Sequence, residues 1–174
     1  MSDAIRVGLV GFGYASKTFH APLIGGTPGM ALKAVASSDA DKVHADWPGV
    51  KVMSAPGDLL DDPDIDLVVI ATPNDTHFPL AKAALEAGKH VVVDKPFTVT
   101  LSQARELESL AKHCGRILSV FHNRRWDSDF LTVSALINEG QLGEVCYFES
   151  HFDRFRPQVR QRWREQAGPG SGIC

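Results

Sequence analysis

Short segments that are apolar at almost every position recur through the first two-thirds of the chain. Such segments suit the strands of a parallel sheet with helices on both faces, because neither side of each strand then meets water. The pattern predicts five strands, over residues 5–10, 32–37, 66–71, 90–94 and 116–121. The segment 32–37 carries the weakest signal.

Segments with helical periodicity lie between these strands. Residues 75–87 repeat apolar side chains at helical spacing, and Gly88 follows as a helix stop. Residues 100–115 begin with Thr100 and Gln103 at the spacing of a capping box. Strand, helix and strand in repetition indicate right-handed βαβ units. We therefore predict the fold class α/β, with the doubly wound parallel sheet of a Rossmann fold.

The pattern changes after Phe121. Residues 127–139 predict a helix, and residues 144–152 predict a single strand rich in aromatic side chains. A lone aromatic strand is prone to aggregate, so it needs cover from another chain, a place in the first sheet, or the rest of a longer protein. We expect a dinucleotide-binding domain over residues 1–122 and the truncated start of a second α/β domain over residues 123–174.

A glycine-rich loop directly follows the first predicted strand. Gly11 and Gly13 are the first two glycines of a G-x-G-x-x-[G/A/S] motif, and Ser16 is its third small residue. The first glycine allows a tight turn, the second lets a pyrophosphate approach the backbone, and the third small residue lets a helix pack close. With Tyr14 and Ala15 between them, these residues predict a dinucleotide site at a helix N-terminus. The alternative is a tight turn that binds no ligand.

The end of the second predicted strand bears on the choice between NAD and NADP. An NAD site places a carboxylate there, on the ribose 2′-hydroxyl. Ser37 and Ser38 come first, and Asp39 follows. Asp39 either takes that role or caps the next helix. Ser38 with Lys42 would instead hold a 2′-phosphate, so the sequence slightly favours NADP and leaves NAD open.

Two further loops follow strands at the sheet edge where ligands of open α/β folds bind. One carries Thr72, Pro73, Asn74 and His77, and the other carries Lys95 directly before a proline, which favours an extended lysine backbone. Both loops therefore face the side of the sheet where a dinucleotide would bind. Helix capping by Asn74, packing by His77 and a solvated surface Lys95 are the alternatives.

The motifs G-F-G, A-T-P-N-D-T-H and D-K-P-F occur in this order with helices between them. Together they resemble the Gfo/Idh/MocA family of NAD(P)-dependent sugar and cyclitol oxidoreductases, and the resemblance covers essentially the whole chain. It implies a Rossmann domain followed by a C-terminal α/β domain with a large open sheet. It also implies that the loop Thr72 to Asn74 lines the cofactor.

The resemblance further implies roles for individual residues. Lys95, which follows Asp94 where the family usually has Glu, matches the catalytic lysine that orients the substrate hydroxyl and the nicotinamide. Trp163 and Arg164 match a pair that approaches the cofactor from the second domain. Family members continue into a D-x-x-x-H helix whose Asp and His complete the catalytic group, and this sequence ends before that motif.

We therefore expect hydride transfer between a nicotinamide and a carbinol carbon of a sugar- or cyclitol-like substrate. We expect that a longer parent performs it and that these 174 residues alone do not turn over. The alternative is a non-catalytic remnant that binds a dinucleotide or pairs with another subunit.

Composition and charge restrict which partners the chain is expected to bind. The chain is 44% hydrophobic, 22% charged and has a formal net charge of −3, so no global positive field draws it to nucleic acid. We expect no membrane segment, because no apolar run approaches the roughly 18 residues of a span. The histidines show no metal spacing, and Cys114, Cys146 and Cys174 suggest free thiols. We expect a cytoplasmic protein without a metal, and the family resemblance implies a homo-oligomer.

Overall fold

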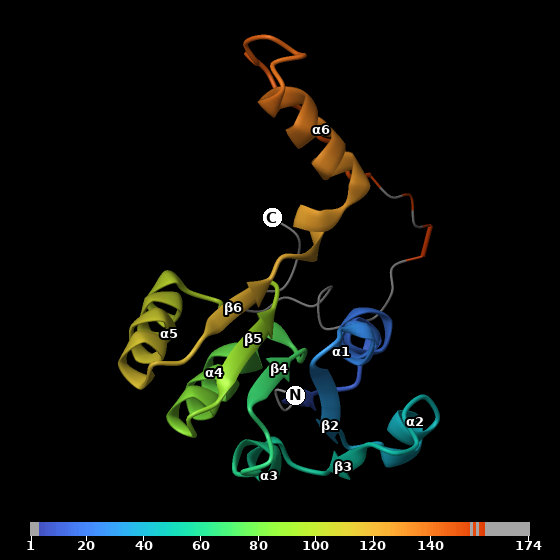
Figure 1. The fold of residues 1–174 in the computed structure, drawn as a ribbon, viewed down its shortest axis with the longest axis vertical. Coiled ribbons are helices and arrows are strands. Elements are labelled where there is room, and N and C mark those ends of the chain that lie inside the picture. The colour runs from blue at the N-terminus through green and yellow to red at the C-terminus, as the bar shows by residue number, and fades with distance from the viewer. Residues whose placement is uncertain (1–3, 154, 156, 159–174) are drawn as a thin grey trace.

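The computed structural model describes residues 4–153, 155, 157 and 158. Within them, six strands form one parallel sheet in the order β3-β2-β1-β4-β5-β6 (Figure 1). The strands are β1 Ile5–Val10, β2 Met30–Ala36, β3 Lys51–Met53, β4 Leu67–Ile70, β5 His90–Asp94 and β6 Leu118–Phe121. This order defines the doubly wound Rossmann fold and confirms the predicted fold class.

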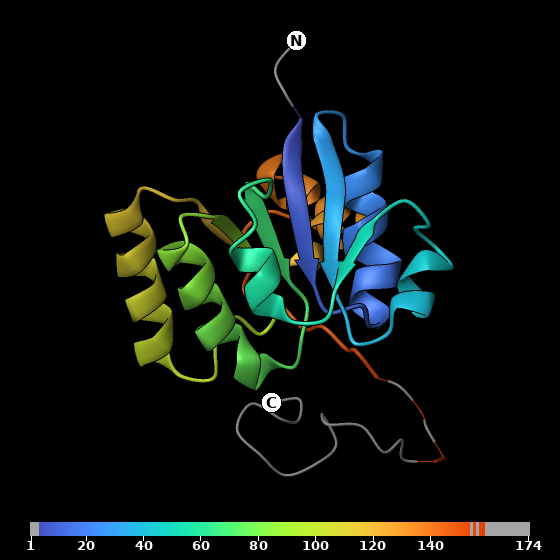
Figure 2. The same ribbon diagram turned by 90° about the horizontal axis from the view of Figure 1, so that it is seen from below.

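Helices cover both faces of this sheet (Figure 2). The helical elements are η1 Ser16–His20, α1 Ala21–Gly26, α2 Ala40–His44, α3 Pro56–Leu60, η2 Asn74–Thr76, α4 His77–Glu86, α5 Leu101–Cys114, η3 Asn123–Trp126 and α6 Ser128–Asn138. Helices α3, α4 and α5 pack on one face, and α1 and α2 pack on the other. None of the helices in the described part of the chain is long and apolar enough to cross a membrane.

The core consists of two apolar clusters, one on each face of the sheet. Strand β5 contributes to both, because Val91 and Val93 belong to the cluster under α4 and α5, while Val92 packs against the other cluster. Successive side chains of a strand point to opposite faces, so a strand covered on both sides must be apolar at every position. This explains why almost continuous apolar runs predicted the strands.

The predicted ends of α5 are confirmed. The Thr100 hydroxyl accepts a hydrogen bond from the Gln103 N–H at 3.3 Å, and Gly115 ends the helix with a φ of 63°. The Gln103 side chain accepts from the N–H of Val99 at 3.3 Å. A capping box would use the N–H of Thr100, so the return bond here reaches one residue further back.

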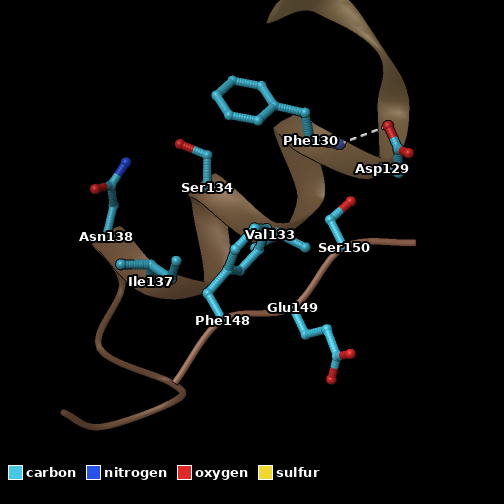
Figure 3. A pocket seen from close by; sticks show the side chains of 9 residues that line it. All are labelled: Asp129, Phe130, Val133, Ser134, Ile137, Asn138, Phe148, Glu149 and Ser150. Atoms are coloured by element: carbon cyan, nitrogen blue, oxygen red, sulfur yellow. Dashed lines mark hydrogen bonds between the residues drawn. The ribbon is translucent and has the colours of Figure 1, made fainter. Parts of the chain in front are cut away.

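Two features differ from the sequence-based expectation. Strand β3 and helix α3 were not predicted, because three and five residues are too few to show a period. The predicted strand over 144–152 is wrong, since this segment joins no sheet among the described residues. A strand is stable only beside a partner strand. Phe148, Glu149 and Ser150 instead run along α6 (Figure 3).

Candidate functional site

The carboxyl ends of the central strands lie side by side. Val10 of β1 is level with Ile70 of β4, and Ile70 is level with Val93 of β5. The loops that follow these strands therefore meet at one edge of the sheet. The strand order reverses between β1 and β4, because β2 and β3 lie on one side of β1 and the later strands lie on the other. Open α/β folds bind their ligands at such a point.

The first turn of the glycine loop requires glycine at position 11. Gly11 has a φ of +88°, and a Cβ atom there would lie 2.9 Å from the carbonyl oxygen of Ala71. Both the backbone conformation and the close approach of the next loop therefore exclude a side chain. Ser16 is fully buried and its hydroxyl donates to the Gly11 carbonyl at 2.8 Å, which closes the loop against the following helix.

The second glycine differs from the first, because the space beside it is open. A Cβ atom on Gly13 would meet nothing within 4 Å. Helical conformation begins at residue 14, with Tyr14 exposed and Ala15 half-buried, and the Gly13 carbonyl accepts from the N–H of Lys17 at 3.0 Å. The loop thus presents an uncovered backbone and the N-terminal N–H groups of a helix, which together suit an anion.

In the loop after β2, the carboxylate of Asp39 has a structural role. Asp39 caps α2, with its Oδ1 atom accepting from the N–H of Lys42 at 2.9 Å. The Ser37 hydroxyl accepts from the N–H of Asp39 at 3.2 Å. Ser38 and the Lys42 side chain are exposed at the same turn. The alternative role of Asp39 as a helix cap is therefore present in the structure.

The loop after β4 is held by short local hydrogen bonds. The hydroxyls of Thr72 and Thr76 lie 2.6 Å apart, and Thr76 also donates to the carbonyl of Pro73 at 2.6 Å. Asn74 is buried at the start of η2, whereas Pro73 is exposed. Only part of the predicted loop is thus accessible to a ligand.

His77 joins this loop to the loop after β5. Its ring is 1% exposed, with Nε2 at 2.9 Å from the Thr72 carbonyl oxygen and Nδ1 at 2.9 Å from that of Pro96. Both nitrogens therefore face partners inside the protein. The packing alternative for His77 matches this geometry, and contact with a cofactor stays a prediction.

Lys95 lies at the end of β5, between a buried carboxylate and a proline. Its backbone N–H donates to Oδ1 of Asp94 at 2.7 Å, and the peptide bond to Pro96 is cis. The Lys95 side chain is exposed. Its ammonium group makes no hydrogen bond or ion pair with any residue that the structure describes, so it is available to a ligand.

The Asp94 carboxyl is ionised in spite of its burial. Burial raises its pKa, but the His20 imidazole, the backbone N–H of Lys95 and the lysine charge outweigh this effect, so the pKa lies below its usual value. His20 lies on η1, a π-helical turn in which Ser16 and His20 are the buried residues. The His20 ring lies against Phe121, with 4.3 Å between ring centroids.

The sequence analysis assigned no role to His20 or Phe121. One lies within a helical segment and the other ends an apolar strand, so no motif or spacing distinguishes them from core residues. Phe121 lies beside Asp94 because β5 pairs with β6, and His20 is buried against Phe121 from η1. Neither feature leaves a recognisable pattern in a single sequence.

Two predicted site residues, Trp163 and Arg164, lie outside the described residues. Arg124, just after the sheet, pairs with Asp127 at 2.6 Å. Among the residues that are described, no cluster of three or more His, Cys, Asp or Glu side chains is placed to hold a metal ion.

A Rossmann sheet with a glycine loop at its crossover point is the arrangement in which proteins of this class bind dinucleotides. Residues 5–122 match the Gfo/Idh/MocA family, described as an oxidoreductase family with an NAD-binding Rossmann fold. Residues 134–174 match the C-terminal α/β domain of the same family. The chain belongs to this oxidoreductase family.

Individual relatives agree with this assignment. The chain is 78% identical to the uncharacterized oxidoreductase YdgJ of Escherichia coli K12 over 99% of its length, and covers 50% of that protein. It is 38% identical to the scyllo-inositol 2-dehydrogenase (NADP(+)) IolW of Bacillus subtilis 168, covering 98% of this chain and 48% of that one. The solved structure of the oxidoreductase YPO2259 from Yersinia pestis superposes with a TM-score of 0.91 at 71% identity, covering 95% and 48% of the two chains. The chain thus spans about half the length of the relatives it matches.

Proposed function

We propose that this chain binds NADP or NAD at the carboxyl edge of its sheet and supplies Lys95 for hydride transfer with a sugar- or cyclitol-like substrate. The observation that carries the proposal is the uncovered backbone at Gly13, where a helix begins. It lies two strands away from Lys95, whose ammonium group pairs with none of the described residues. The name of IolW, an inositol dehydrogenase that uses NADP(+), supports the substrate class and the cofactor.

The residues present fit a dinucleotide. Gly11 turns the chain in a conformation that a side chain would prevent, and the open space at Gly13 leaves room for a pyrophosphate against the backbone. The helix that starts there offers N–H groups and the positive end of its dipole. The bound nicotinamide would supply or accept the hydride.

In the proposed reaction, the protein orients the substrate and polarises its reacting oxygen. Lys95 presents a positive charge from the end of β5, where its ammonium group is free to meet a substrate hydroxyl or carbonyl oxygen. A cation placed there stabilises negative charge that develops on that oxygen. In the proposed reaction a histidine from the longer parent moves the proton. These 174 residues are therefore expected to bind a dinucleotide and to show no sugar or inositol dehydrogenase activity.

Calorimetric titration of the chain with NADPH and NADH tests the binding step. Gly13→Val is expected to abolish binding, because its side chain fills the space that the pyrophosphate needs. Gly49→Val is the matched control, since Gly49 is exposed, has no positive φ and has no neighbour within 4 Å of an added Cβ atom. Absence of binding heat for both dinucleotides on a folded sample would contradict the proposal.

The preference for NADP rests on the turn after β2. Asp39 is already engaged as the cap of α2, while Ser38 and Lys42 are exposed beside it and would suit a 2′-phosphate. Lys42→Ala is expected to weaken NADPH binding about 10-fold, the effect of losing one charge-assisted hydrogen bond, and to leave NADH binding unchanged. Tighter binding of NADH than of NADPH by the unmodified chain would contradict the preference.

We also propose that the chain forms a homo-oligomer through the face that α6 shares with residues 145–150. Phe148 and Tyr147 are 71% and 77% exposed, and an aromatic surface of this kind is poorly solvated. Phe148→Ser is expected to lower the mass seen by light scattering, whereas Ile117→Ser, at an exposed position beside β6, is not. A monomer at all concentrations would contradict this proposal.

A further inference from the structure

A buried histidine nitrogen near the loop after β5 has no hydrogen-bond partner within the part of the chain that the structure describes. His20 is 4% exposed, and its Nε2 atom is buried without a hydrogen bond to any of the described residues. Such an atom destabilises a fold, because it has given up its hydrogen bonds to water. Its presence beside the candidate site indicates a role that packing alone does not explain.

The unpartnered nitrogen faces the Asp94 carboxylate. His20 Nε2 lies 3.9 Å from Asp94 Oδ2, which is beyond a hydrogen bond and within the range of an ion pair with a protonated ring. The other oxygen of the same carboxylate, Oδ1, accepts the backbone N–H of Lys95 at 2.7 Å. Asp94 therefore stands between the histidine and the lysine, with one oxygen turned toward each.

Three elements fix the position of the His20 ring. The ring projects inward from η1, and it lies against Phe121 at the end of β6 with 49° between the ring planes. Phe121 is the register partner of Asp94, so the aromatic contact and the carboxylate belong to neighbouring positions in the sheet. This packing holds the ring beside the carboxylate and restricts its rotation.

We infer that His20 is a positioning residue for Lys95 and that it acts through the Asp94 carboxylate. The inference rests on the proposed function, in which Lys95 meets the substrate oxygen. The ring restrains the carboxyl group from the Oδ2 side, which keeps Oδ1 on the lysine backbone. Because the helical segment that carries His20 begins at the glycine loop, the same contact sets the position of the lysine relative to the dinucleotide loop.

The backbone amide proton of Lys95 reports directly on this arrangement. A hydrogen bond to a carboxylate shifts an amide proton downfield, so the NMR resonance of Lys95 measures how well Oδ1 is held. His20→Phe keeps an aromatic ring against Phe121 and removes both ring nitrogens. We expect this variant to move the Lys95 resonance upfield, in the same direction as Asp94→Asn, because a less firmly held carboxylate makes a weaker hydrogen bond.

His113→Phe is the matched control, because His113 is exposed on α5 and away from the pair. It is expected to leave the Lys95 resonance in place. An unchanged resonance in folded His20→Phe protein, where Asp94→Asn does move it, would overturn the inference. If His20→Phe does not fold, His20→Gln and His20→Asn decide the question. The longer amide can reach toward Asp94 and is expected to keep the resonance nearer its original position, and equal resonances in the two variants would contradict the role of His20.

Spectra are recorded without a dinucleotide, so this test does not depend on the proposed function. A chain that shows the coupling and binds no dinucleotide supports the His20 assignment and contradicts the binding proposal. A chain that binds NADPH and shows no coupling contradicts the assignment alone. The same samples can be titrated afterwards with NADPH, which gives both results for one preparation.

Discussion

The sheet region, residues 5–121, and the α6 region, residues 127–153, place their apolar side chains in opposite environments. In the sheet region, apolar residues from strands and helices meet in two buried clusters. In the α6 region no residue of the helix is buried, and Phe130, Leu131 and Ile137 are between 41% and 51% exposed. Figure 1 shows α6 projecting beyond the end of β6, away from the other helices.

The difference between the two regions distinguishes what nearby residues determine, the ends of a helix, from what distant residues determine, its burial. Helix α6 begins and ends where its sequence predicts, with Gly140 after it at a φ of +70°. An open groove of about 390 Å³ between α6 and Phe148 to Ser150 shows that packing there is incomplete (Figure 3). Local signals therefore determine where α6 begins and ends, while its burial, and most of the stability of so short a helix, requires a partner surface.

The largest expected difference is in core truncation. Leu85 of α4 is fully buried, so Leu85→Ala is expected to lower the free energy of unfolding by about 2–5 kcal/mol through lost burial and a cavity. Leu131 of α6 is 46% exposed and does not line the groove beside Phe148, so Leu131→Ala is expected to cost about 0.5 kcal/mol or less. Urea unfolding of both variants at equal protein concentration measures the two values.

A large loss of unfolding free energy in Leu131→Ala would contradict the contrast between a buried sheet region and an exposed α6. It would mean that α6 buries this side chain in solution against a surface outside the described contacts. Repeating the unfolding at several protein concentrations identifies that surface, because burial against a second copy makes the apparent stability depend on concentration.

A smaller effect tests how closely the sheet region is packed. A Cβ atom on Gly25 of α1 would lie 2.5 Å from the ring of Trp47, whereas one on Gly26 would meet nothing within 4 Å. Gly25→Ala is expected to destabilise by about 1–3 kcal/mol through overpacking. Gly26→Ala is expected to be neutral, or stabilising by about 0.5–1 kcal/mol, because alanine has the higher helix propensity. Thermal unfolding of the two variants distinguishes them, and equal midpoints would mean that Trp47 moves aside without cost.

Much of the sheet region was predictable because its signals are local. The apolar runs identified five of the six strands, and Thr100 and Gly115 marked the ends of α5. The loops at the carboxyl edge followed from the rule that parallel strands end together. The short strand β3 lacked such a signal, since three residues give no periodicity.

The features that could not be predicted depend on contacts between residues that lie far apart in the chain. The segment 144–152 has the composition of a strand, but a strand depends on a neighbour that its own residues cannot specify. His20 lies 3.9 Å from Asp94, although seventy-four residues separate the two in the chain, and Phe121 lies beside Asp94 because β5 pairs with β6. The two ring nitrogens of His77 likewise find carbonyl partners five and nineteen residues away, which no motif announces.

The smallest expected effect compares the ion pairs of the two regions. Arg6 donates to Asp66 through both its side chain and its backbone, and this lowers the pKa of Asp66 from 3.8 to about 2. A carboxyl with a lowered pKa stabilises the fold above the pKa of the unfolded chain, about 4, and this stabilisation is lost as the pH falls toward 2. Asp66→Asn is therefore expected to remove about 1 kcal/mol or less at pH 7, because the pair is partly exposed, and to flatten the stability profile between pH 4 and 2.

Asp127→Asn, which removes the local pair with Arg124 next to α6, is expected to change stability by less than about 0.5 kcal/mol. Denaturant unfolding from pH 2 to 7 compares the variants, and an unchanged acid profile for Asp66→Asn would show that the Arg6 pair does not stabilise the sheet region.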